Sequence, residues 1–170
     1  MLDTAPDFDA RFFRTALGRF ATGVTVVTTA APDGAPIGLT VSSFNSVSLD
    51  PPLVLWSLSR GSASLDIFEQ CERYVVNVLS AEQIALARRF AQGHTRERFN
   101  GVPRVRAPGG TPMLDADCAA WFECRNRSRY AEGDHLIMVG QVERCGHSAK
   151  APLVFHAGGF DLTPAHKHSE

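Results

Sequence analysis

The feature that most constrains the fold is a succession of short β-branched segments with few helices between them. Residues 24–29 read Val-Thr-Val-Val-Thr-Thr, and comparable runs follow at 37–44, 53–58 and 74–79. Turn-forming residues separate them, as at 32–34, where Pro-Asp-Gly supplies a fixed φ and then a positive one. Contiguous strands do not follow the alternating rhythm of a doubly wound sheet. The pattern therefore predicts a mainly β fold, an antiparallel barrel with peripheral helices.

Three helices and further strands are expected around this framework. Apolar residues at helical spacing over 13–20 predict the first helix, a short helix begins near Ser64, and residues 80–83 fit a capping box that opens the third. Residues 94–112 are the least regular part. The largely apolar segment 53–58 is expected to be buried on both faces. The other expected strands are 46–49, 118–125, 135–144 and 153–156.

Length, charge and targeting patterns bound the class of protein. The 170 residues predict one domain, with residues 1–9 as an N-terminal extension, 10–162 as the domain and 163–170 as a polar tail. A net charge of −1 gives no global field for nucleic acid or anionic lipid. The N-terminus lacks a signal-peptide pattern, and no apolar run reaches the length of a membrane span. We expect a cytoplasmic protein with no membrane or nucleic-acid partner.

Two segments rich in hydroxyl groups are candidates for ligand binding. The first, Thr40-Val41-Ser42-Ser43, offers three hydroxyls at the end of a strand, although it could be a solvated strand. The second runs from a strand into a helix start, where free N–H groups favour an anion, and Arg60 could add a charged contact. The alternative is plain N-capping by Ser62 or Ser64. The second segment comprises Ser57, Leu58, Ser59, Arg60, Gly61, Ser62, Ala63 and Ser64.

Two histidines and several absent motifs complete the inventory. His135 follows Gly133-Asp134 at the start of a strand and could face a pocket. His156 could likewise face a pocket, and either histidine could instead have a purely structural role. No G-x-G-x-x-G fingerprint, G-x-S-x-G elbow or H-E-x-x-H motif occurs. None of the four cysteines forms a C-x-x-C pair, so no metal site is expected. Six arginines between residues 88 and 106 could serve a phosphate or a solvated helix face.

Several short motifs follow one another in a specific order along the chain. They are Phe-Ala-Thr-Gly-Val-Thr-Val-Val-Thr at 20–28, Gly-Leu-Thr-Val-Ser-Ser-Phe-Asn-Ser-Val-Ser-Leu-Asp-Pro-Pro at 38–52, Tyr-Val-Val-Asn-Val-Leu at 74–79, Arg-Phe at 98–99, Gly-Asp-His at 133–135 and Pro-Leu-Val-Phe-His at 152–156. Through the order and spacing of these motifs, the sequence resembles the short-chain flavin reductases, the reductase components of two-component flavin monooxygenases, over about residues 10–162.

The resemblance implies an antiparallel split β-barrel of the FMN-binding type, a homodimer, and hydride transfer from NADH or NADPH to FMN or FAD for a partner monooxygenase. It implies that residues 40–43 hold the flavin ring edge and ribityl chain and that 57–64 hold the phosphate. It also places Phe99 and His156 at the cofactor site and His135 near the nicotinamide. Two alternatives stay open: a flavin-binding carrier or sensor without turnover, and a related barrel that acts on a corrinoid or pyridoxamine phosphate.

Overall fold

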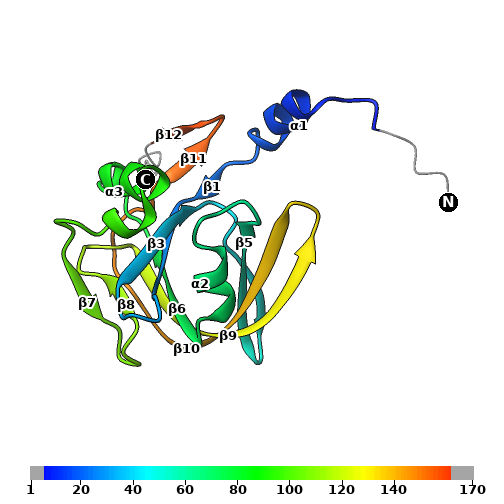
Figure 1. Ribbon diagram of the computed structural model, residues 1–170. Helices are drawn as coiled ribbons and strands as arrows, with labels where there is room; N and C mark the ends of the chain where they lie inside the picture. Colours follow the sequence, from blue (N-terminus) through cyan, green and yellow to red (C-terminus); the bar gives the residue numbers. More distant parts are fainter. Residues whose placement is uncertain (1–5, 162–170) are drawn as a thin grey trace.

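A curled antiparallel sheet of seven strands forms the body of the molecule in the computed structural model, which describes residues 6–161 (Figure 1). The strand order is β3-β2-β6-β9-β10-β5-β4, and every neighbouring pair is antiparallel. The edge strands β3 and β4 do not pair with each other in the described residues. The strands are β2 (Thr25–Ala30), β3 (Pro36–Val41), β4 (Asn45–Leu49), β5 (Pro52–Ser59), β6 (Arg73–Val78), β9 (Ala120–Glu132) and β10 (His135–His147). The predicted mainly β, antiparallel fold is confirmed.

Two smaller sheets lie beside the main one. Strands β1 (Thr22–Gly23), β11 (Val154–His156) and β12 (Gly159–Asp161) form one, and β7 (Arg104–Arg106) and β8 (Pro112–Leu114) form the other. The sequence pattern indicated neither the β7–β8 hairpin nor β12. Strands of three residues are too short to show an alternation of apolar and polar residues, so tertiary contacts decide their conformation.

Apolar side chains form two clusters on opposite sides of β2. The cluster inside the barrel contains Trp56, whose ring packs edge-on against Phe68 and Tyr74 at centroid distances of 5.3 and 5.5 Å. The second cluster contains Phe90 and Phe99, in edge-to-face contact at 4.9 Å. These contacts bury large aromatic surfaces and fix the barrel against the helix that carries Phe90.

Strand β5 differs from the expectation that both of its faces are buried. Val54, Trp56 and Leu58 are buried, whereas Leu55 and Ser57 are only half-buried. The side chains of a strand alternate between faces, and here one face meets the barrel core while the other is incompletely covered by this chain. The expectation was wrong because a run of apolar residues does not reveal how completely neighbouring elements cover each face.

The helices lie at the periphery, as predicted. They are α1 (Ala10–Leu17), α2 (Leu65–Gln70), α3 (Ile84–Ala91) and the 3-10 helix η1 (Thr95–Glu97). The expected capping box does not open α3, because the helix begins at Ile84 and its N-cap is Gln83, not Ser80. Gln83 Oε1 does accept the Ser80 N–H at 2.9 Å, but the Ser80 hydroxyl has no partner in the described residues. Helix α1 begins after Asp9, whose carboxylate accepts the Phe12 N–H at 2.7 Å.

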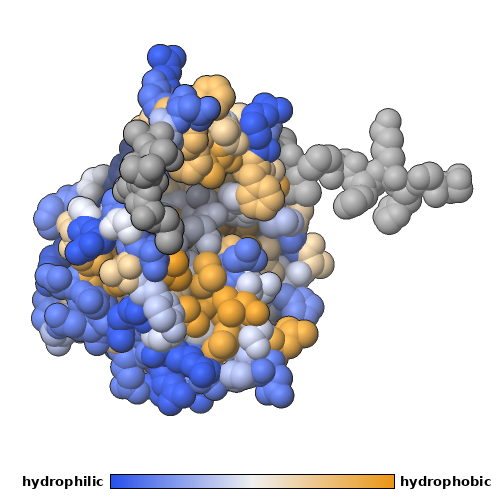
Figure 2. All heavy atoms as spheres, turned by 90° about the vertical axis from the view of Figure 1, so that its right-hand side faces the viewer, coloured by the Kyte–Doolittle hydropathy of each residue, from blue (hydrophilic) through white to orange (hydrophobic). Residues whose placement is uncertain are grey.

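Helix α1 stands away from the barrel and buries none of its residues (Figure 1). Phe12, Leu17 and Phe20 have 67, 58 and 77% of their surface exposed. Figure 2 shows apolar side chains gathered on the side of the molecule to which α1 belongs. The apolar residues whose spacing predicts this helix therefore form a face that no other element within residues 6–161 covers.

Candidate functional site

A cleft of about 360 Å³ lies where the end of β3 meets β5 and the start of β10. The two hydroxyl-rich segments and His135 converge in it, although they are distant in the sequence. This volume falls within the range of about 300–1,000 Å³ that is usual for ligand sites. The lining residues are Leu39, Thr40, Val41, Ser42, Ser43, Ser57, Leu58, Ser59, Ser62 and His135.

The hydroxyl groups of the first segment are divided between folding and the cleft. The Thr40 hydroxyl donates to the Ala87 carbonyl at 2.7 Å and so holds β3 against α3. The Ser43 hydroxyl donates to the Ser57 carbonyl at 3.3 Å and accepts the Ser57 N–H at 2.9 Å. Ser42 is exposed, and its hydroxyl makes no hydrogen bond to the part of the chain that the structure describes. Ser42 is therefore the hydroxyl of this segment that is free to bind a ligand.

The loop between β5 and α2 uses most of its N–H groups internally. The Gly61 N–H donates to Ser59 Oγ at 3.2 Å, the Ser62 N–H to the Ser59 carbonyl at 3.0 Å, and the Ser64 N–H to Ser62 Oγ at 3.2 Å. Within the described residues, the Ala63 N–H has no acceptor, and the Ser59 and Ser62 hydroxyls donate to no other residue. Together with the exposed Arg60 guanidinium, these donors can hold an anion by charge-assisted hydrogen bonds.

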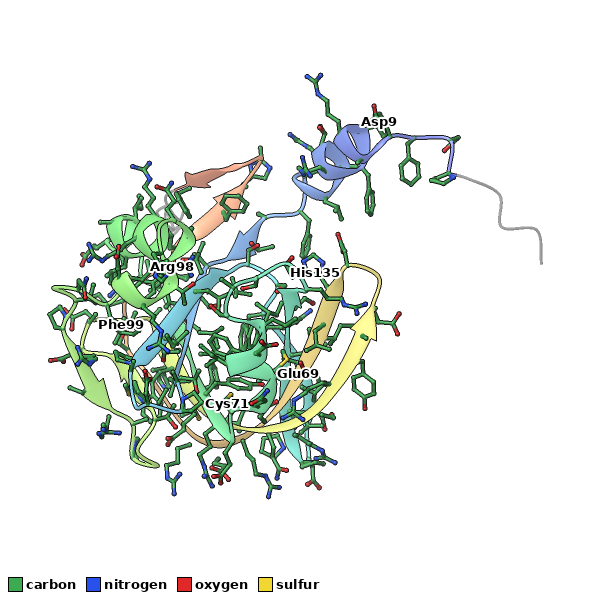
Figure 3. The ribbon with its side chains drawn as sticks, viewed as in Figure 1. Asp9, Glu69, Cys71, Arg98, Phe99 and His135 are labelled. Atoms are coloured by element: carbon green, nitrogen blue, oxygen red, sulfur yellow. The ribbon has the colours of Figure 1, made fainter. Side chains whose placement is uncertain are left out.

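His135 begins β10 directly opposite Ser59 of β5. Its Nδ1 lies 2.7 Å from Asp134 Oδ1, and this hydrogen bond lowers the pKa of the Asp134 carboxyl below its ordinary value. The backbone N–H of Arg60 donates to the Asp134 carbonyl at 2.9 Å. This hydrogen bond ties the loop of residues 59–64, which we call the anion loop, to the turn before β10. Figure 3 shows His135 at the tip of the β9–β10 hairpin. The ring is thus oriented at the mouth of the cleft by a neighbouring carboxylate.

Five predicted site residues do not line this cleft: Arg60 and Ala63 of the loop after β5, and Ser64, Phe99 and His156. Ser64 is buried and its hydroxyl donates to Thr95 Oγ1 at 3.5 Å. Phe99 is 4% exposed and packs against Phe90 behind β3. His156 is half-buried on β11, in the separate three-stranded sheet. Roles for these side chains at a cofactor stay predictions.

A second, larger cavity of about 630 Å³ adjoins the first, with Ser62 lining both. It is lined by Arg96 and Arg98, two of the six arginines that could serve either a phosphate or a solvated helix face. The arginines that cluster after Gly93 are the sequence signal that could have indicated this second cavity. Among residues 6–161, no group of three His, Cys, Asp or Glu side chains could hold a metal ion. No helix in that range is long and apolar enough to cross a membrane.

The chain matches known proteins over most of its length. Residues 17–163 match the family described as Flavin reductase like domain. The chain is 44% identical to FMN reductase (NADH) SmoA of Agrobacterium fabrum, over 89% of this chain and 85% of that protein. It is 36% identical to the flavin-dependent monooxygenase reductase subunit HsaB of Rhodococcus jostii, over 92% of this chain and 79% of the relative. It spans 51 and 49% of the length of two further relatives.

A solved structure shows the same architecture. The NADH:FAD oxidoreductase SgcE6 of Streptomyces globisporus, in complex with NAD and FAD fragments, superposes with a TM-score of 0.87 at 33% identity. The superposition covers 96% of this chain and 99% of that one. The two chains therefore share a fold over nearly their whole length.

Proposed function

This chain belongs to the flavin reductase like domain family and is an oxidoreductase of that type, and from this premise we propose its particular reaction. It transfers hydride from NADH or NADPH to FMN or FAD. The observation that carries the proposal is the convergence of Ser42 and His135 with Ser59 and Ser62 of the loop after β5 in one cleft. Relatives named FMN reductase (NADH) and NADH:FAD oxidoreductase support it.

The cleft fits the two ends of a flavin mononucleotide. The Ser42 hydroxyl suits the ring edge or the ribityl hydroxyls, and the half-buried Ser43–Ser57 contact keeps this wall in place. The Ser59 and Ser62 hydroxyls, the Ala63 N–H and the Arg60 guanidinium are donors suited to a phosphate dianion. Because these donors lie on one turn of chain, they can bind several phosphate oxygens together.

The protein's part in this reaction is alignment more than acid–base chemistry. When bound, a flavin supplies the ring that accepts hydride. The walls formed by β3 and β5 hold that ring, and His135, fixed through Nδ1 by Asp134, positions the dinucleotide against it. Holding two reactants in register removes much of the entropic barrier to their reaction. No catalytic base is required of His135, so we assign it a positioning role.

The apolar face of α1 supports a homodimer. Phe12 and Leu17 of α1, and Phe20 just after it, are exposed, and α1 buries none of its residues. Leu49 of β4 is a further large apolar side chain, 95% exposed. An exposed apolar area of this kind marks an interaction site. We propose that a second copy of the chain covers it.

The product of the proposed reaction is reduced flavin, and we propose that a flavin-dependent monooxygenase consumes it. Relatives named as monooxygenase reductase subunits support this partner. Use of NADH or NADPH also favours the predicted location in the cytoplasm.

Multiple-turnover kinetics test the proposed function. Purified protein at catalytic concentration is mixed with NADH or NADPH and an excess of FMN or FAD, and nicotinamide absorbance is followed. A reductase consumes many equivalents of dinucleotide, whereas a flavin carrier or sensor consumes at most one per bound flavin. Absence of turnover with both flavins and both dinucleotides contradicts the proposal. Turnover that occurs only with a corrinoid or with pyridoxamine phosphate would favour the other barrel chemistries.

A further inference from the structure

A pocket of about 290 Å³ lies beside α2, apart from the flavin cleft. It is formed between α2 and the end of β2 with the turn that follows β2, and none of its residues lines the flavin cleft. Figure 3 shows Cys71, one of its residues, on the side of α2 away from His135. The proposed hydride transfer makes no use of this hollow. We call it the α2 pocket, and its lining residues are Ala30, Pro32, Asp66, Ile67, Gln70 and Cys71.

Most of the lining of the α2 pocket is apolar. Ala30, Pro32 and Ile67 contribute hydrocarbon, and Cys71 contributes a thiol. Burial raises the pKa of this thiol, an effect larger than the opposing effects of its hydrogen bonds and of the Arg129 charge, so the thiol is neutral at neutral pH. An apolar cavity of about 150 Å³ can hold a benzene molecule. The α2 pocket therefore has room for a ring of that size with a short polar arm.

Asp66 and Gln70 add two exposed polar side chains to this lining, four residues apart on one face of α2. Within residues 6–161, the Asp66 carboxylate forms no ion pair, and neither side chain makes a hydrogen bond. Asp33, which follows Pro32 in the turn, is already paired with Arg96 at 2.7 Å. Among the same residues, no lysine or arginine lines the pocket. An unpaired carboxylate beside an apolar surface is complementary to an organic cation.

The α2 pocket is connected to the anion loop through Ile67. This residue lines both the α2 pocket and the second cavity, whose wall includes Ser62 of the anion loop. The first residue of α2 is tied to the same loop, because the Leu65 N–H donates to the Ser62 carbonyl at 3.1 Å. A ligand that holds α2 in place therefore also holds the loop proposed to bind the flavin phosphate.

We propose that the α2 pocket is a regulatory site for a small organic cation, a primary amine with an apolar body of about the size of a benzene ring. Its ammonium group binds Asp66 and its apolar body packs on Ile67 and Cys71. Occupancy of the pocket strengthens FMN binding, because a loop already held in its binding conformation binds its ligand more tightly. This last step rests on the proposed function.

Three ring compounds of similar size but different charge test the proposal. Benzylamine, protonated at neutral pH, is the probe, and neutral benzyl alcohol and anionic benzoate are its controls. Binding is measured by titration of the wild-type protein with each compound, followed by the NMR shifts of the backbone amides. We expect the amide signals of Ile67 and Cys71 to move with benzylamine at lower concentrations than with the other two compounds.

A charge-removing variant and a matched control assign the binding to Asp66. Asp66→Asn should weaken benzylamine by about two- to fivefold, as for the loss of one exposed ion pair, and should leave benzyl alcohol unchanged. Glu69→Gln is the control, because Glu69 is also an exposed carboxylate of α2 but does not line the pocket. It should change neither affinity. Asp66 also lies in the first turn of α2, where a carboxylate favours the helix, but a purely structural role would not distinguish the two compounds.

Calorimetric titration with FMN tests the regulatory step. Saturating benzylamine should lower the dissociation constant of FMN by about fivefold, the lower end of the usual coupling between two sites. Riboflavin, which has no phosphate for the anion loop, should change much less. Saturating benzyl alcohol serves as the control for effects of the ring alone.

Three outcomes overturn the inference while leaving the proposed function intact. The first is equal affinity for benzylamine and benzyl alcohol, and the second is an Asp66→Asn variant that binds benzylamine as the wild type does. The third is an FMN affinity that saturating benzylamine does not change. If instead neither FMN nor FAD binds to the wild-type protein, the proposed function itself fails, and the NMR titration still shows whether the α2 pocket binds the amine.

Discussion

Ser43 and Ser57 exchange a reciprocal pair of hydrogen bonds that joins the segment after β3 to the middle of β5. The Ser57 N–H donates to Ser43 Oγ at 2.9 Å, and the Ser43 hydroxyl donates to the Ser57 carbonyl at 3.3 Å. Strands β3 and β5 are not neighbours in the sheet order, so this contact is made by a side chain at the opening of the barrel. A hydroxyl expected to bind ligand thus forms one wall of the cleft.

Replacing Ser43 by alanine is expected to lower stability and flavin affinity together. The half-buried Ser57 N–H loses its acceptor, which costs about 1–3 kcal/mol, and the cleft wall is no longer fixed. Ser42→Ala is the matched control, because the Ser42 hydroxyl has no partner within the described residues; it should reduce flavin affinity with the melting temperature unchanged. Thermal melts and flavin fluorescence titrations measure both. Equal melting temperatures for the two variants would contradict the assigned difference.

The anion loop is expected to distinguish flavins with and without phosphate. Ser62→Ala removes a hydroxyl donor and should weaken FMN by about tenfold or more, while riboflavin, which has no phosphate, changes little. Arg60→Ala should act in the same direction without affecting stability, since Arg60 is exposed. Titration of each variant with both ligands provides the comparison. Equal losses for FMN and riboflavin would show that this loop does not bind the phosphate.

His135→Ala is expected to raise the KM for NADH and to lower kcat/KM by about five- to 150-fold, the usual loss for one positioning contact. Flavin affinity should change much less. If His135 only stabilises the turn through Asp134, the melting temperature falls and the kinetics stay as in the wild type. Melting curves and NADH kinetics on the same preparation separate these outcomes.

Stability is expected to fall as the pH rises above about 9. Burial raises the pKa of the Cys118 thiol to about 11 and of the Cys124 thiol to about 12, and it also raises the pKa of the Tyr74 hydroxyl. An acid whose folded pKa is raised contributes stability that is complete below its unfolded pKa and is lost as the pH rises through the folded value. Urea unfolding between about pH 7 and pH 10 should show the decline.

Cys118→Ala is the control for this pH dependence. It removes one of the groups whose pKa burial raises, so the free energy of unfolding should depend less steeply on pH than in the wild type. A free energy that stays constant up to about pH 10 in the wild type would refute the assignment.

Helix α1 is expected to hold the proposed dimer together. Leu17→Ser, on an exposed apolar face, should shift sedimentation from dimer to monomer at micromolar concentration while the monomer remains folded. Val105→Ser is the control, because Val105 is an exposed apolar residue on β7, 42% accessible, in another part of the molecule. A wild-type protein that sediments as a monomer would exclude the dimer proposal.

Much of the fold could be predicted because its main strands carry strong local signals. Residues 24–29 and 74–79 are rich in β-branched residues, and the strands observed there deviate by one residue at each end. The short strands β7, β8 and β12 could not be predicted in this way. Their conformation depends on neighbours that the sequence does not show, such as Thr28, whose hydroxyl donates to the Pro112 carbonyl at 2.6 Å.

The site was predicted at the level of segments, and its atomic roles were not. Residue type indicated the segments of Ser42, Ser62 and His135 only as separate candidates, and the structure shows that all three line one cleft. Residue type also could not show that the Thr40 hydroxyl donates to the Ala87 carbonyl. A hydroxyl has the same chemistry whether it faces a ligand or a helix carbonyl, and only the fold decides which. The burial of Phe99 illustrates the same limit for an aromatic residue.

The hydrogen bond from the backbone N–H of Arg60 to the Asp134 carbonyl leads us to expect coupling between the affinities of flavin and dinucleotide. It connects the loop proposed for the phosphate to the turn that carries His135, so a ligand that restrains one also restrains the other. Conformational entropy lost when the first ligand binds is not lost again with the second, which makes the two bind cooperatively. By linkage, flavin must tighten the dinucleotide by the same factor as the dinucleotide tightens flavin.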